Sequence, residues 1–130
     1  MRTAAVSPRM RLAGWTLTAL CTAVMLASAS AKLFAPPEVL EPASRVFGFP
    51  MQSLQWLAAL EVGCALLYAW PRTALLGAVV LTGYLGGAVA THARLGEPAM
   101  LFPVALGVCA WMGLYLREPR LRALAPIVQA

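Results

Sequence analysis

Four apolar runs, each long enough to cross a lipid bilayer, divide this chain of 130 residues. They cover residues 12–31, 53–70, 74–91 and 100–116. An α-helix rises about 1.5 Å per residue, so a run of about 20 residues spans the hydrocarbon core of a bilayer. The runs therefore predict an all-α fold, a transmembrane four-helix bundle that forms one membrane domain over residues 1–130.

The charged residues are too few to cover a water-facing surface, because they make up 12% of the chain, whereas a soluble domain carries about 25%. The net charge of +5 could suggest nucleic acid, but most basic residues fall on one side of a four-span topology. Cytoplasmic loops show that distribution. It predicts a multi-pass membrane protein with both termini cytoplasmic and no nucleic-acid partner. The residues concerned are Arg2, Arg9, Arg11, Arg72, Arg117, Arg120 and Arg122.

The first apolar run has a second interpretation. A basic start, an apolar centre and the triplet Ala29-Ser30-Ala31 also fit a signal peptide that is cleaved from the mature protein. The run over residues 12–31 is longer than the apolar part of most such peptides. We therefore expect residues 1–31 to be retained as the first span.

The longest connection, residues 34–52, is expected to hold a short helix. Pro36 and Pro37 stop the first helix. Residues 37–47 can then form an interfacial helix that lies on the bilayer, and Gly48-Phe49-Pro50 turns the chain. An irregular loop is the alternative.

Six polar side chains form a candidate pocket near one face of the membrane. Counting from the helix ends places Glu61 and Tyr84 about 12 Å below this outer face, and Ser28 about 6 Å below it. The other three lie at the mouth. The predicted lining is Ser28, Lys32, Glu61, Tyr84, His92 and Arg94.

Glu61 is the most informative of these residues. An ionised carboxylate near the bilayer centre costs about 3 kcal/mol on insertion scales, so helices normally turn it inward. It is then either protonated, or ionised and paired with Lys32, Arg94 or the Tyr84 hydroxyl. In either state it could hold the bundle together, or it could contact a ligand and carry a proton.

Small residues mark the third run. Gly83 and Gly87 are four residues apart, a spacing that lets helix backbones touch. We expect this face to pack within the bundle, or against a second copy or a partner membrane protein. The cysteines form no CxxC motif and are expected to be packing residues. A single histidine without spaced carboxylates predicts no metal site.

Several segments of the sequence resemble one family. They are Ser30-Ala31-Lys32-Leu33, Gly48-Phe49-Pro50, Leu60-Glu61, Pro71-Arg72-Thr73, residues 81–92 and Trp111-Met112-Gly113-Leu114. Over about residues 25–125 the chain resembles the DoxX-like membrane proteins. The resemblance implies a small four-helix protein of a bacterial-type inner (plasma) membrane. The wider group includes a subunit associated with archaeal thiosulfate:quinone oxidoreductase, and relatives linked to redox or thiol homeostasis. A quinone is therefore the cofactor that the resemblance suggests, although no cofactor motif is evident.

Three functions stay open at this point. The first is an accessory or small-molecule-binding membrane subunit, linked to quinone or thiol redox metabolism through the resemblance. The second is a small membrane enzyme in which Glu61 and Tyr84 handle protons while Lys32, His92 and Arg94 orient a polar head group. The third is a transporter subunit.

Overall fold

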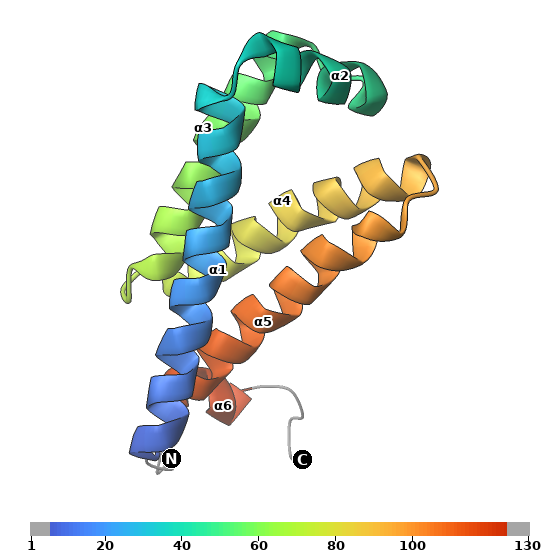
Figure 1. Cartoon of the computed structure of the whole chain (residues 1–130). Coiled ribbons are helices and arrows are strands. Elements are labelled where there is room, and N and C mark those ends of the chain that lie inside the picture. The colour runs from blue at the N-terminus through green and yellow to red at the C-terminus, as the bar shows by residue number, and fades with distance from the viewer. Residues whose placement is uncertain (1–5, 125–130) are drawn as a thin grey trace.

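The computed structural model describes residues 6–124, which are helical throughout apart from short connections and contain no strand (Figure 1). The elements are α1 (Pro8–Phe34), α2 (Pro37–Phe47), α3 (Met51–Ala69), α4 (Ala74–Arg94), the 3-10 turn η1 (Pro98–Met100), α5 (Leu101–Arg117) and α6 (Pro119–Leu124). The predicted all-α class is confirmed.

Three of these helical segments are long and apolar enough to cross a membrane. They are α1, α4 and the segment Pro98–Arg117, which joins η1 to α5. The helix α3 is not among them. It carries Gln52, Gln55 and Glu61, and these residues lower its hydropathy. The four long helices nevertheless coincide closely with the four predicted runs.

Local sequence signals define the helix ends. Ser7 caps α1, because its hydroxyl accepts a hydrogen bond from the Met10 amide at 3.3 Å, and Pro8 occupies the first turn. The helix α2 begins at Pro37 and ends at Gly48, whose φ of 72° suits a residue without a side chain. The short helix expected at residues 37–47 is therefore present, and the irregular-loop alternative is wrong.

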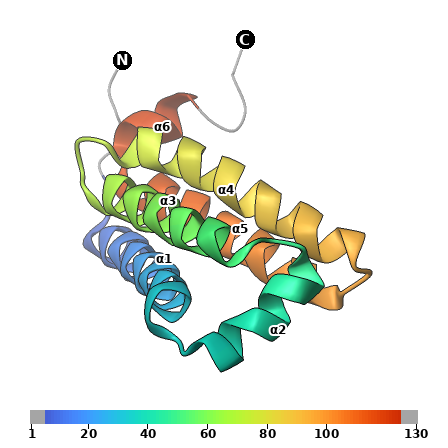
Figure 2. The same ribbon diagram turned by 90° about the horizontal axis from the view of Figure 1, so that it is seen from above.

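The core lies where the two pairs of long helices meet. The helix α1 packs against α3 and α5, and α4 packs against α3 and α5 (Figure 2). Many of the core side chains are small. The buried cluster includes Cys21, Met25, Cys64, Ala65, Tyr68, Ala74, Ala78, Leu81, Leu85, Leu106, Ala110 and Leu114. Two of the three cysteines are thus buried, and all three are free thiols.

The closest helix contacts involve glycines other than the predicted pair. A Cβ added to Gly77 would lie 2.2 Å from the Tyr68 amide nitrogen, so α4 touches the α3 backbone there. Around Gly83 and Gly87, by contrast, an added Cβ would meet no atom within 4 Å. The expectation that these two glycines pack within the bundle is wrong, because α4 turns them toward open space.

Tyr68 links three helices at the core. Its hydroxyl donates to the Ala110 carbonyl of α5 at 2.7 Å and lies 3.4 Å from the Thr18 hydroxyl of α1. Arg117 donates to the Tyr68 carbonyl at 3.0 Å and stacks over the Trp15 ring at 4.4 Å. The buried phenol therefore joins α3 to α1 and α5.

Tyr68→Phe is expected to lower the free energy of unfolding by about 1–2 kcal/mol, because the Ala110 carbonyl would stay buried without this donor. Unfolding by sodium dodecyl sulfate in mixed micelles, followed by circular dichroism, measures the change. Tyr115→Phe is the matched control, and no comparable loss is expected there. Equal stability of Tyr68→Phe and the wild type would contradict a stabilising role for this bond.

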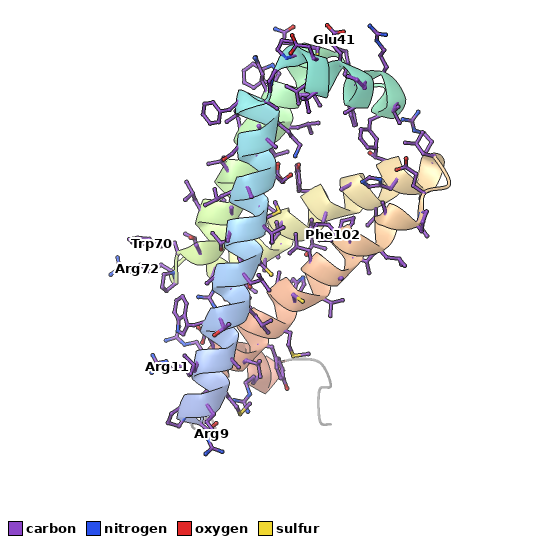
Figure 3. All side chains as sticks on the ribbon, in the orientation of Figure 1. Arg9, Arg11, Glu41, Trp70, Arg72 and Phe102 are labelled. Atoms are coloured by element: carbon purple, nitrogen blue, oxygen red, sulfur yellow. The ribbon has the colours of Figure 1, made fainter. Side chains whose placement is uncertain are left out.

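The bundle opens toward one end. The α4/α5 hairpin diverges from α1 and α3, and α2 crosses that end (Figures 1 and 2). Charged side chains lie at both ends, and Arg45 and Arg94 are at the open end with α2. Arg9 and Arg11 lie at the closed end with α6, whereas Glu41 of α2 lies at the open end (Figure 3). The diverging helices place the candidate site at the open end.

Candidate functional site

A cavity of about 490 Å³ lies between the diverging helices, and we call it the polar cavity. Four long helices and the α2–α3 connection contribute to it. Its lining is Val24, Met25, Ser28, Lys32, Phe47, Phe49, Leu54, Leu57, Leu60, Glu61, Gly83, Tyr84, Leu85, Gly87, Ala88, Thr91, His92, Phe102, Pro103 and Leu106. Five of the six predicted pocket residues are in this set.

An ion pair forms the polar wall of the cavity. The Lys32 ammonium of α1 lies 2.7 Å from Oε2 of Glu61 on α3. The Glu61 side chain is only 3% exposed, and the Lys32 side chain is 24% exposed. Of the partners considered for Glu61, the structure places Lys32 within hydrogen-bond distance. This pairing neutralises the buried carboxylate and joins two helices.

Ser28 supplies the other two hydrogen-bond acceptors of the Lys32 ammonium. The ammonium lies 2.6 Å from the Ser28 hydroxyl and 3.4 Å from the Ser28 carbonyl, one helical turn before it on α1. An ammonium has three hydrogens, and these two acceptors together with Glu61 account for all of them. Lys32 therefore keeps no hydrogen for a ligand in this arrangement.

Tyr84 and His92 line the same cavity from α4. His92 Nδ1 lies 2.8 Å from Oε2 of Glu97, and its ring packs edge-on against Phe47 at 5.2 Å between centroids. The bond to Glu97 orients the imidazole. Tyr84 lies beside Glu61. The second ring nitrogen of His92 is consequently the polar group of the cavity with the most freedom to meet a ligand.

Arg94 does not line the cavity. Its Nη2 donates to the Phe47 carbonyl at 2.7 Å, which ties the end of α2 to the end of α4. A Cβ at Gly48 would lie 3.6 Å from the same guanidinium. Arg94 therefore holds α2, the helix that crosses the open end, against α4. Arg94 was predicted at the mouth of the pocket. It lies near the cavity residue Phe47, but it binds the backbone carbonyl of that residue and does not line the cavity.

Sequence reasoning missed several cavity residues and one ion pair. Phe47 and Phe49 line the cavity from the end of α2 and the connection after it. Phe102, which is labelled in Figure 3, lines it from α5. The pairing of His92 with Glu97 was also missed. The spacing of five residues across a helix end could have indicated that pair, whereas nothing in the sequence fixes the direction of the phenylalanines.

The cavity is suited to an amphipathic molecule. Leucine, phenylalanine, methionine and valine side chains form most of the wall, and the polar groups gather on α1, α3 and α4. Ligand pockets commonly combine an apolar wall with a few fixed polar groups. Within residues 6–124 no group of three histidine, cysteine or acidic side chains is placed to hold a metal ion.

A family comparison identifies the kind of protein. The model of the DoxX-like family matches residues 16–113. The chain belongs to the DoxX-like family. The match confirms the resemblance, and it includes every residue that lines the polar cavity. Neither the curated proteins nor the solved structures contain a match to the chain. The family and the apolar helices identify a membrane protein.

Proposed function

We propose that this protein is an accessory, small-molecule-binding subunit of the membrane, whose ligand occupies the polar cavity. The observation that carries the proposal is the Lys32–Glu61 pair at the wall of an apolar cavity of about 490 Å³. A buried ion pair contributes little net stability compared with apolar residues of the same volume. Ionisable residues inside a membrane more often mark a functional site.

The contacts favour a neutral ligand. Lys32 and Glu61 cancel each other's charge, and the ammonium hydrogens already have acceptors. An anionic ligand would find no free cation among the cavity residues unless His92 were protonated. Tyr84 and His92 offer hydrogen bonds to an uncharged polar group, and the apolar wall suits a ring or a hydrocarbon chain.

A quinone has the chemistry that these residues suit. Its carbonyl oxygens accept hydrogen bonds, one of which the Tyr84 hydroxyl could donate, while Phe47 and Phe102 line the cavity beside it. His92 Nδ1 faces the Glu97 carboxylate, so Nε2 of the neutral ring would accept a hydrogen bond from a hydroxyl of the reduced form. When bound, a quinone would supply two-electron redox chemistry. The residues of this chain would hold the ring, orient its carbonyls and keep water away.

The proposal includes a membrane topology. In it α3 crosses the bilayer with the other three long helices, because its acid is paired within the bundle. The helix α2 lies on the outer surface, and both termini lie in the cytoplasm of a bacterial-type inner membrane, as the arginines near the closed end favour. Residues 1–31 are retained, since Cys21 and Met25 of α1 belong to the core.

A partner is also part of the proposal. Gly83 and Gly87 line the polar cavity and have open space beside them. A second copy or another membrane subunit that contacts this face would complete the wall of the cavity. Crosslinking followed by mass spectrometry in mild detergent tests this arrangement.

The Gly87→Leu variant tests ligand binding. An added Cβ at Gly87 meets no atom within 4 Å, so the leucine can fill the cavity without displacing a helix. We expect affinity for a benzoquinone with a decyl tail to fall about tenfold, as one overpacked contact predicts. Isothermal titration of the detergent-purified protein measures the affinity.

The matched control is Gly86→Leu, because Gly86 also has open space beside it but does not line the polar cavity. It should bind the quinone as the wild type does. Decanoate, an anion with a similar tail, should bind more weakly than the quinone. Equal affinities for quinone in Gly87→Leu and the wild type would count against the cavity as the site.

A further inference from the structure

The outer side of the α4/α5 hairpin carries a second hollow, which we call the outer groove. Its volume is about 680 Å³. Leu85 and Pro103 line both hollows and so form the partition between them. The other residues of the groove are Thr82, Gly86, Val89, Val104, Gly107, Val108, Trp111, Met112, Tyr115 and Leu121.

The interior of the outer groove suits hydrocarbon. Its two central polar groups bind each other, since Trp111 Nε1 donates to the Thr82 hydroxyl at 2.8 Å. That hydroxyl in turn donates to the Ala78 carbonyl at 2.7 Å. Neither group is left to attract a polar ligand. Gly86 and Gly107 deepen the groove because they lack side chains.

A cationic group stands at one end of the groove. Tyr115 and Leu121 line that end, and the Arg122 guanidinium stacks over the Tyr115 ring, with Cζ 5.8 Å from its centroid. Nη1 of Arg122 is shielded from solvent and has no acceptor among residues 6–124. A buried donor of a charged group without an acceptor is costly. An anion at this end would supply the acceptor.

Within residues 6–124 no acidic side chain forms an ion pair with Arg122, and Glu38 lies on α2 with Glu41. Glu61 is paired with Lys32, and Glu97 is paired with His92. The other pair in the described part of the chain, Glu41 with Arg45, belongs to α2 at the open end. Glu118 accepts from the Arg120 amide. A second copy of this basic chain would bring further arginines to the closed end, so it fits the groove poorly.

We propose that the outer groove binds an anionic phospholipid, with an acyl chain along α4 and α5 and the phosphate at Arg122. Basic sites at the cytoplasmic ends of membrane helices attract anionic head groups in this way. The apolar lining would hold the acyl chain, and Nη1 of Arg122, which has no acceptor among residues 6–124, would hold the phosphate. This site is independent of the ligand in the polar cavity.

Native mass spectrometry of the full chain in mild detergent tests the proposal. The probes are dioleoylphosphatidylglycerol and dioleoylphosphatidylcholine, with inorganic phosphate as a third arm. We expect the wild type to prefer the anionic lipid about tenfold, and Arg122→Gln to abolish this preference. The matched control is Arg120→Gln, which removes the same charge from an exposed position on α6 and should keep the preference.

Variants at the two glycines separate this site from the polar cavity. Gly86→Leu should weaken binding of both lipids, because it fills the groove, whereas Gly87→Leu should not affect it. Circular dichroism confirms that each variant is folded. An equal loss of preference in Arg120→Gln and Arg122→Gln would overturn the proposal, since diffuse surface charge would explain it. Inorganic phosphate binding as tightly as the lipid, or a dimer that excludes lipid, would also overturn it.

Discussion

Lys32→Met is expected to lower the free energy of unfolding by about 3 kcal/mol, because it leaves the Glu61 carboxylate buried without its partner. The Glu61 side chain is 3% exposed, so water cannot replace the ammonium. Glu61→Leu should cost less. The Lys32 side chain is 24% exposed and can move its charge toward the surface. Unfolding in mixed micelles by sodium dodecyl sulfate measures both changes.

The double variant Lys32→Met/Glu61→Leu should recover most of the loss, since an apolar pair of similar volume often replaces a buried ion pair at little cost. The control is Arg45→Met, which breaks the exposed pair with Glu41 on α2 and should cost less than about 0.5 kcal/mol. If Lys32→Met proved as mild as Arg45→Met, Glu61 would not depend on Lys32. The quinone affinity of the folded double variant then separates stability from ligand binding.

Much of the fold could be predicted from the lengths of the apolar runs and from the residues that end helices. The apolar runs, the prolines at 36 and 37 and the Gly48 turn each predicted an element that the structure contains. The grouping of three site residues was also predictable. Ser28, Glu61 and Tyr84 were placed in one half of the bundle by counting residues, and all three line the polar cavity. Rise per residue is nearly constant in a helix, so such counts need no tertiary information.

The rotation of each helix about its own axis and the divergence of α4 from α3 could not be predicted in the same way. Gly83 and Gly87 have the spacing of a packing face, but this spacing alone does not say which neighbour the face meets. In the structure α4 leaves α3 after their shared turn, so only its first turns are in close contact. The later glycines then line the space that opens. The same divergence admits Phe47 from α2, which no local pattern indicates.

The close contact between α3 and α4 at Gly77 predicts a second large loss of stability. Gly77→Ala is expected to destabilise the protein by about 3 kcal/mol or more, at the upper end of overpacking costs. The added Cβ would lie 2.2 Å from the amide nitrogen and 2.4 Å from the Cα of Tyr68, and backbone atoms cannot rotate away as a side chain can. The two helices must separate, and this movement would disturb the Tyr68 hydroxyl that joins α3 to α5.

Gly83→Ala on the same helix is the matched control, because its added Cβ meets no atom within 4 Å. Replacing a glycine in a helix interior is worth about 0.5–1 kcal/mol, so this variant should be slightly more stable than the wild type. Unfolding in mixed micelles measures both variants. A similar stability for Gly77→Ala and Gly83→Ala would be incompatible with a tight α3–α4 contact at Tyr68. A loss confined to Gly77→Ala would locate the contact that sets the angle between the helices, and with it the width of the polar cavity.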